Sequence, residues 1–494
     1  MHTEKLISEM RRLFAPRSLC TAAISRGIRG YEVLQTTNWC GNVQFDAAEV
    51  HAPSSSFELE RLIGCAESSV HVVGRGHSFS PMAECSGGTL LSLHRLNRIL
   101  DFKEPSSANG GVGSITVEGG TTYTEIARFL AGRGALRNLP SCPQFTVAGA
   151  IATGTHGSGV HARNLAADSI SMLEFVAGDG SLVRYSRDGS ADLLEGCRTH
   201  LGVLGVVSQL TLDVVPFFEV DARTYVDVPL EPVVERLPDL WRSCDSLSVW
   251  TAGLGTGPGS GLCWITLRHF HPHFEPSIAA PPAAPVDAGM LGSQGFLMER
   301  PVPRYCSDDG SLFTPTRRGP WHSTLSLTLN DDCEETSMAV VDIQAEFFVP
   351  IEHAQEAIRA VWDVARLWSF SSPWGRQESQ PAKGLIDAME FRQVKGDGAW
   401  LSPQPVDSLG LHISFNADPT LRVEVLGTAL PAIEAALARF GARAHWGKLG
   451  DATFEPSRVE ELYGERLQRF RTLARNHDPQ GRFLNEHMRR VLRL

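Results

Sequence analysis

Several features that would place this chain of 494 residues in a special class are missing from it. No apolar stretch approaches the length of about eighteen residues that a membrane-spanning helix needs. The formal net charge is −11, so the chain lacks the basic field with which nucleic-acid-binding proteins attract phosphate. We therefore expect neither a membrane span nor a nucleic-acid partner.

Cysteine pairs at the spacing of metal ligands are also lacking. The ten cysteines are scattered without a C-x-x-C pair, and the C-x-x-H of Cys197 and His200 has no second pair nearby. This distribution favours neither a metal site nor a dense disulfide framework, so we expect no metal and a reducing, cytoplasmic setting. The first thirty residues contain five arginines, which leaves organellar targeting as an alternative, but they lack a secretory apolar core and include Glu4 and Glu9.

What is present is the composition of an ordinary globular protein, with 42% hydrophobic and 20% charged residues. The chain is long enough for two domains, and short strands alternate with helices up to Pro216. We predict an α+β fold and not a doubly wound sheet. The predicted domains are residues 1–217, with an N-terminal extension at 1–37, and residues 218–494, with a proline-rich surface insertion or lid near 272–303.

Local patterns predict the individual elements. Capping boxes that begin at Ser55 and Thr122 predict helices to about Glu67 and Gly132, and apolar spacing predicts a helix from about Ile351 to Trp368. Strands are predicted at residues 70–73, 89–93, 114–118, 173–177, 182–185, 206–215, 220–228, 262–270 and 345–349.

The most informative segment is residues 146–159, which contains four glycines and three alanines but no acidic residue, lysine or arginine. Such backbone can approach a large anionic ligand and offer it N–H groups. The glycine spacing matches neither the dinucleotide fingerprint nor a phosphate-binding loop with its lysine. We expect a buried cofactor that carries phosphate, and a loop shaped only by packing is the alternative.

A second glycine turn follows a predicted strand. Residues 70–73 run into Gly74-Arg75-Gly76-His77-Ser78-Phe79-Ser80, where one histidine stands between small residues. A lone histidine is usually a satisfied polar group, and that is the alternative here. The glycines before His77 would also let backbone approach a ligand at which the imidazole points.

Taken together, these motifs resemble those of FAD-linked oxidases of the vanillyl-alcohol-oxidase superfamily, especially alditol oxidases and aldonolactone oxidases. The resemblance also rests on residues 38–42, 204–207 and 445–448, and it covers nearly the whole chain. It implies an FAD-binding domain of mixed sheets, followed by a substrate domain with an antiparallel sheet and flanking helices. It further implies covalent FAD, joined through its 8α-methyl group to His77. The implied FAD-binding residues are Gly74, Arg75, Gly76, His77, Ser78, Phe79, Ser141, Cys142, Thr146, Gly149, Thr153, Gly154, His156, Gly157, Ser158, Val207 and His445.

Polar residues of the second half could face the flavin. Glu390 and Arg392 share one face of an extended segment, as do His412 and Ser414. An exposed strand pair, a histidine that caps a carbonyl and a solvated Lys448 are the alternatives. The resemblance implies that the substrate-binding residues are Ser141, Glu390, His412 and Ser414, and that the catalytic residues are Arg392 and Lys448. Ser414 stands where the family has threonine, which keeps the hydroxyl and removes a methyl group.

The expected reaction is the oxidation of a primary alcohol of a polyol, with hydride transfer to FAD and reduction of oxygen to hydrogen peroxide. An aldonolactone oxidase or dehydrogenase is the alternative enzyme, and a flavin-bearing protein with a degenerate site is the alternative class.

Cys142 stands at a position where the alditol oxidases carry an apolar residue. Berberine-bridge-type oxidases form a second flavin bond through a cysteine at a similar place, whereas a cysteine that acts as a small hydrophobic residue is the alternative.

Overall fold

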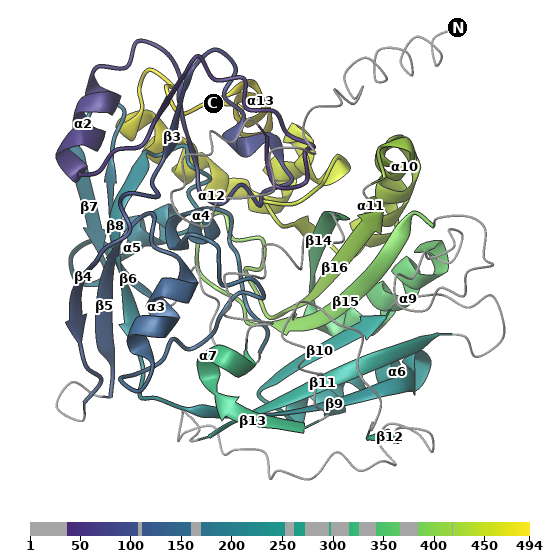
Figure 1. Ribbon diagram of the computed structural model, residues 1–494. Coiled ribbons are helices and arrows are strands. Elements are labelled where there is room, and N and C mark those ends of the chain that lie inside the picture. The colour runs from purple at the N-terminus through teal and green to yellow at the C-terminus, as the bar shows by residue number, and fades with distance from the viewer. Residues whose placement is uncertain are drawn as a thin grey trace, which may run out of the picture.

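The computed structural model describes residues 37–106, 111–159, 169–251, 261–271, 296–297, 316–325, 342–365, 384–416 and 418–494. Helices and three sheets form two halves that face each other (Figure 1). This architecture confirms the predicted α+β class. Apart from Thr37, the predicted N-terminal extension lies outside the described residues, and so does the proline-rich insertion except for residues 296–297.

A small parallel sheet opens the first half. Its order is β1 (Glu49–His51), β3 (Thr89–Ser92) and β2 (Val70–Val73). Helix α2 (Ser56–Gly64) packs Leu59 and Ile63 into the same apolar cluster as the strands. The Ser55 hydroxyl accepts the Glu58 N–H at 3.2 Å, as a cap should. The Glu58 side chain, however, accepts from the Ser54 N–H, so the predicted capping box is only half formed, and the helix ends before Glu67.

An antiparallel sheet of five strands completes the first half. Its order is β4 (Ile99–Lys103), β5 (Gly113–Glu118), β8 (Val206–Val214), β6 (Ile170–Val176) and β7 (Leu182–Ser186). Helix α3 (Tyr123–Leu130) begins in the complete capping box predicted for Thr122 and Glu125. Helix α5 (Arg187–Cys197) follows β7. Most strands lie within a few residues of their predicted bounds.

The second half is built on a nine-stranded sheet. Along it lie β12 (Phe296–Leu297), β9 (Glu219–Pro229), β11 (Leu262–His271), β10 (Ser246–Thr251), β15 (Ile386–Val394), β16 (Ser408–Asn416), β14 (Asp342–Pro350) and β17 (Arg443–Ala444), while β13 (Thr316–Pro320) also pairs with β9. Helices α6 (Leu230–Arg242), α9 (Ala354–Ala365) and α11 (Leu430–Ala438) lie on the side of this sheet away from the first half (Figure 1). The buried apolar spacing predicted for the helix after 351 is confirmed within α9.

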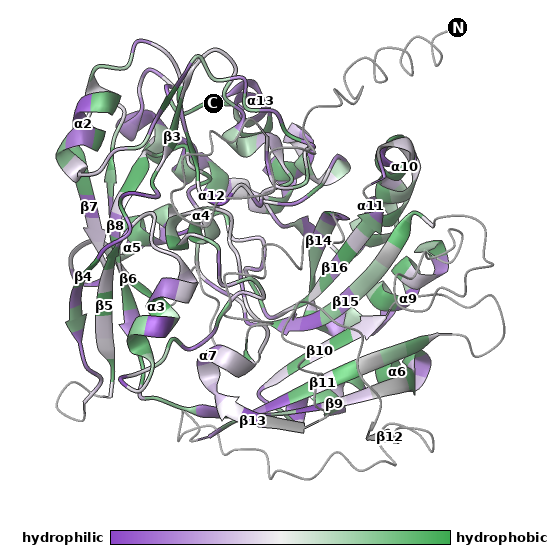
Figure 2. Cartoon of the chain, viewed as in Figure 1, coloured by the Kyte–Doolittle hydropathy of each residue, from purple (hydrophilic) through white to green (hydrophobic). Residues whose placement is uncertain are grey.

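Alternation along the central strands gives this sheet two different faces. On β14, β15 and β16 the residues Phe347, Phe391 and Leu411 belong to the apolar core. Their neighbours Glu346, Glu390 and His412 point the other way, because successive side chains of a strand alternate. Figure 2 shows the resulting bands of hydrophobic and hydrophilic residues along the strands. The polar face is the one turned toward the first half.

The C-terminal segment returns to the first half. After α10 (Pro419–Glu424), helices α12 (Pro456–His477) and α13 (Glu486–Leu492) close the chain. The Val70 N–H donates to the Arg482 carbonyl at 2.8 Å, and the Asn485 amide donates to the Pro81 carbonyl at 2.8 Å.

The domain boundary at 217/218 stays a prediction. In the part of the chain that the structure describes, no helix has the length and apolar character needed to cross a membrane.

Candidate active site

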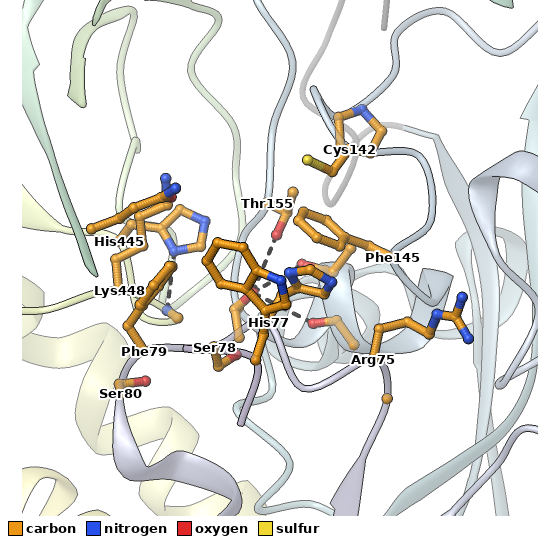
Figure 3. Close-up of a pocket in the computed structure, with 18 of the residues that line it drawn as sticks. Arg75, His77, Ser78, Phe79, Ser80, Cys142, Phe145, Thr155, His445 and Lys448 are labelled. Atoms are coloured by element: carbon orange, nitrogen blue, oxygen red, sulfur yellow. Dashed lines mark hydrogen bonds between the residues drawn. The ribbon is translucent and has the colours of Figure 1, made fainter. Parts of the chain in front are cut away.

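A cavity of about 350 Å³ lies between the two halves. One wall is formed by the turn at residues 74–80 and the segment from 140 to 156, and the other by the polar face of the large sheet. Figure 3 shows His77, Phe145 and Thr155 gathered near the centre of this space, with Lys448 and His445 to one side and Cys142 above. The two glycine-containing motifs and the polar strand residues therefore meet in one place.

The turn that carries His77 is held on two sides. The Trp39 N–H donates to the Gly76 carbonyl at 2.7 Å, and the Phe79 N–H donates to the Gly447 carbonyl at 2.8 Å. Gly76 has a φ of +71°, a conformation that favours glycine. The imidazole of His77 stacks on the Trp39 ring at 5.4 Å between centroids. Burial, with a contribution from Arg75, lowers the pKa of His77 to about 4, so the ring is neutral at neutral pH.

Part of the predicted glycine loop is helical. Residues Val147–Ala152 form the short helix α4, and the segment is extended only after Gly154. Thr146, at the start of α4, lies against the first turn: a Cβ on Gly74 would come within 2.4 Å of its hydroxyl oxygen. The absence of a side chain at Gly74 thus lets the two segments meet in the cavity wall.

Four of the expected FAD-binding residues do not line the cavity, namely Gly154, Gly157, Ser158 and Val207. A Cβ on Gly157 would lie 2.1 Å from the Asn138 side chain, and the Ser158 hydroxyl donates to the Leu247 carbonyl at 2.7 Å. Val207 is buried in β8. These four residues therefore lie outside the cavity lining. The other thirteen, from Gly74 to His445, line the cavity.

The polar sheet residues stand in one row across four strands. Trp250 pairs with Glu390, Glu390 with His412, and His412 with Glu346. Neighbouring strands lie about 4.8 Å apart, so a row of this kind places its side chains in contact. Arg392 lies two residues along the same face of β15. The long-range pairing of the sheet, which the local spacing does not reveal, is what brings these residues together.

Glu346 is the central residue of the row, and the sequence analysis missed it. Its carboxylate is 1% exposed and accepts from Arg392 Nη2 at 2.7 Å. It also lies 3.0 Å from Lys448 Nζ and 3.1 Å from His156 Nε2. Burial raises the pKa of Glu346, but Lys448, Arg392 and His156 outweigh it and hold that pKa well below its ordinary value. The sequence does hold one signal that could have pointed to Glu346, because it is an acidic residue inside the apolar run 345–349.

Glu390 and Arg392 are buried, at 4% and 6% exposure, which excludes the exposed strand pair. Arg392 Nε lies 3.2 Å from a Glu390 carboxylate oxygen, and Arg392 Nη1 donates to the Ser141 hydroxyl at 3.1 Å. Burial raises the pKa of Glu390, although Arg392 opposes this. The Ser141 contact links the wall of the first half to the sheet.

His412 lies between Lys448 and Ser414, not against a carbonyl. Lys448 Nζ donates to His412 Nδ1 at 2.8 Å. An ammonium only donates, so Nδ1 accepts and the Nε2–H donates to the Ser414 hydroxyl at 3.2 Å. Burial and the nearby Lys448 keep the pKa of His412 well below its ordinary value. Because Lys448 is ion-paired and only 16% exposed, it is not a solvated charge.

The remaining predicted residues also line the cavity. Cys142 is a half-buried cysteine of the cavity wall. Burial lowers the pKa of His445 to about 3, and its Nδ1 accepts the Gly447 N–H at 3.0 Å. Further lining residues that the sequence analysis did not single out are Asp342, Gln344, Trp250, Phe145 and Thr155. Within the described ranges, no group of three or more histidines, cysteines or acidic residues could hold a metal ion.

The lining chemistry fits a flavin dinucleotide. The first wall offers glycine backbone and the hydroxyls of Ser78, Thr146, Thr153 and Thr155, which can bind phosphate and ribityl oxygens. Aromatic rings flank His77, and the charged sheet face lies opposite. The fold and the cavity define the class of FAD-dependent oxidoreductases that place the cofactor between a binding domain and a substrate domain.

The comparisons with known proteins agree with this class. A family described as an FAD binding domain matches residues 47–186, and one described as D-arabinono-1,4-lactone oxidase matches residues 333–491. An alditol oxidase of a Streptomyces species is 31% identical over 92% of this chain and 98% of its own length. An L-gulonolactone oxidase of Mus musculus is 25% identical over 94% and 99%, and an L-gulono-1,4-lactone dehydrogenase of Mycobacterium tuberculosis is 27% identical over 92% and 98%. The chain belongs to the vanillyl-alcohol-oxidase family of FAD-linked oxidases.

Proposed function

We propose that this protein oxidises a primary alcohol group of an open-chain polyol to the aldehyde, with oxygen as the electron acceptor and hydrogen peroxide as the second product. The observation that carries the proposal is the pair of cations formed by the buried Arg392 and the half-buried Lys448, beside a sheet face that also bears hydrogen-bonding side chains. The similarity to an alditol oxidase over nearly the whole chain supports the same substrate class.

The residues of the first wall would hold FAD, with a covalent bond at His77 and Cys142 as a candidate for a second. The neutral imidazole of His77 and its place in the cavity wall support the first bond. When bound, the flavin supplies the hydride acceptor and the site of oxygen reduction.

Arg392 and Lys448 are the groups that stabilise the oxygen of the reacting alcohol as it loses its proton. This proton and the hydride from the carbon together account for the two hydrogens of the hydrogen peroxide. Cations placed beforehand in a site shielded from water stabilise a developing negative charge more strongly than water does. Lys448 is kept in place by His412 and Glu346, and Arg392 by Ser141 and Glu346. Neither cation needs to move when the charge appears.

Glu390, His412, Ser414 and Ser141 bind the remaining hydroxyl groups of the substrate. A site built to hydrogen-bond hydroxyls discriminates strongly against analogues that lack them, because its buried polar groups are then left unpaired. An open-chain polyol offers one hydroxyl on each carbon. The density of polar groups on this face therefore favours a polyol over a cyclic lactone.

An aldonolactone is the second candidate substrate. It is favoured by the match of residues 333–491 to the family described as D-arabinono-1,4-lactone oxidase and by the two lactone-oxidising relatives. A lactone would use the same cavity and flavin, and the same cations would act on its ring hydroxyl.

Oxygen uptake by the purified holoprotein tests the oxidase activity. With xylitol or sorbitol we expect oxygen consumption with one peroxide formed per oxygen consumed. Reduction of an artificial dye with no oxygen uptake would instead identify a dehydrogenase. A yellow protein that responds to no polyol or lactone would indicate a degenerate, binding-only site.

A further inference from the structure

Glu346 binds both of the cations proposed for the reaction. Its Oε1 accepts from Arg392 Nη2 at 2.7 Å and faces His156 Nε2 at 3.1 Å, while its Oε2 lies 3.0 Å from Lys448 Nζ. Glu346 lies on β14 in the second half, whereas His156 lies in the glycine-containing segment of the first half. One buried carboxylate thus ties together the two cations and the opposite wall.

Most of the acceptor capacity of this carboxylate is used by the protein itself. An ionised carboxylate offers roughly four lone-pair positions, and Oε1 already has two partners. Glu346 is therefore poorly placed to accept from a substrate hydroxyl. Its position fits the task of holding other groups, as a positioning residue.

The two cations of the site, Arg392 and Lys448, both lie next to carboxylates. Glu346 contacts both Lys448 and Arg392, and Glu390 lies 3.2 Å from Arg392. Two cations without this compensation would form a site for an anion, because buried charges are screened far less than exposed ones. With Glu346 and Glu390 in place, and with Asp342 also lining the cavity, the two cations leave this face no excess of positive charge for an anionic ligand.

We propose that Glu346 positions Arg392 and Lys448 and cancels one of their charges, so that the site accepts a neutral polyol and rejects the corresponding sugar acid. This inference rests on the proposed function, because it names the ligand class that the same site excludes. A polyol and its aldonate share the same hydroxyl pattern and differ at one end, where the aldonate carries a carboxylate. The discrimination must therefore come from charge and not from the shape of the hydroxyl groups.

The test compares the binding of D-gluconate to the holoprotein and to variants, by calorimetry at pH 6, where lysine is protonated and the carboxylate of gluconate is ionised. Glu346→Gln keeps the side-chain shape and removes the charge. Glu346→Asp keeps the charge. Glu118→Gln is the matched control, because Glu118 is a buried carboxylate, with a 6% exposed side chain, that pairs with Arg98 at 2.7 Å and does not line the cavity.

We expect Glu346→Gln to bind gluconate at least about tenfold more tightly than the wild type, a gain of about 1.4 kcal/mol. Glu346→Asp and Glu118→Gln should bind it as the wild type does. The double variant Glu346→Gln with Lys448→Gln restores the charge balance and should lose the gain. Gluconate affinity within about threefold of wild type in folded Glu346→Gln would overturn the proposal.

The remaining outcomes concern folding and the relation to the proposed function. If Glu346→Gln does not fold, the double variant with Lys448→Gln should fold, because it leaves no uncompensated cation; equal misfolding of both would assign Glu346 to packing and overturn the proposal. The binding measurement needs no turnover. If Glu346→Gln binds gluconate more tightly but the wild type oxidises no alditol, the proposed function is wrong and the charge role of Glu346 stands. If the wild type oxidises alditols but Glu346→Gln does not bind gluconate more tightly, the charge role is wrong and the proposed function stands.

Discussion

His77 and Cys142 line the same cavity and are both candidates for a covalent bond to the flavin. We expect denatured wild-type protein to stay yellow and fluorescent, because the proposed bond would hold the flavin on His77. If Cys142 forms a second bond, His77→Ala should also retain flavin after denaturation, and only the double variant with Cys142→Ala should release it. The measurement is flavin absorbance in the acid supernatant and in the pellet.

Complete release of flavin from the wild type would contradict the bond at His77. Release from the single variant His77→Ala would reject the second bond and leave Cys142 as a residue of the cavity wall.

Lys448→Met should lower kcat/KM for an alditol by at least about a hundredfold, the scale of one lost charge-stabilising group. The reason is the loss of one of the two cations that we propose to act on the reacting oxygen. Lys395→Met is the control, since Lys395 pairs with Asp407 and its side chain is 38% exposed, outside the cavity. Steady-state oxygen uptake measures both variants. A change within about threefold for Lys448→Met would remove Lys448 from the reaction.

Single residues with a recognisable motif could be predicted from the sequence. The turn around His77, the Glu390–Arg392 pair and Lys448 all lie at the cavity. Glu346 could not be found in this way, because its partners come from β15, from the segment after β17 and from the glycine segment, and only the folded sheet brings them within 3.1 Å.

Helix α3 supports the wall of the cavity from behind. The Thr124 N–H donates to the Pro143 carbonyl at 2.8 Å and the Val147 N–H to the Thr121 carbonyl at 2.8 Å, so the segment that holds Ser141 and Cys142 depends on the start of this helix. Thr122→Ala removes the hydroxyl that accepts the Glu125 N–H at 3.2 Å. We expect a loss of about 1 kcal/mol in the free energy of unfolding, measured by urea titration.

Thr122→Ser keeps the hydroxyl and should restore most of that loss. If the alanine and serine variants are equally destabilised, the missing methyl group is responsible and the capping explanation is wrong.

Helices and strands could be predicted from the sequence where a short local pattern indicates one structure clearly. The capping box at Thr122 and the apolar strand at 70–73 are examples. Helix α4 was hidden because its glycine and alanine residues carry no apolar periodicity, and because its N-cap Thr146 lies against the distant turn at Gly74. The order of strands in the nine-stranded sheet is a property of long-range pairing, which local spacing does not encode.

Buried histidines give the whole molecule a predictable response to acid. Burial lowers the pKa of His71, His200 and His487 to about 4 and that of His445 to about 3, from an ordinary value of 6.5. The unfolded chain therefore binds more protons between pH 6.5 and about 4 than the folded chain does. The contribution of these histidines to the free energy of unfolding therefore falls as the pH is lowered through this window, by at most about 1.4 kcal/mol per pH unit for each histidine.

Melting temperatures of the holoprotein between pH 7.5 and pH 4.5 measure this effect. They should decrease below pH 6.5, and His200→Gln should make the decrease less steep. A melting temperature that stays constant or rises toward pH 5 would mean that these histidines are not buried in their neutral form.

We propose the polar sheet face as a binding site for open-chain polyols. The most direct measurement is kcat/KM of the wild-type holoprotein, by oxygen uptake, for a panel of short alditols and 1,4-aldonolactones. We expect at least one alditol to have a higher kcat/KM than every lactone, because Glu390, Arg392, His412 and Ser414 can bind several hydroxyl groups of an extended chain. A lactone with a higher kcat/KM than every alditol tested would contradict it.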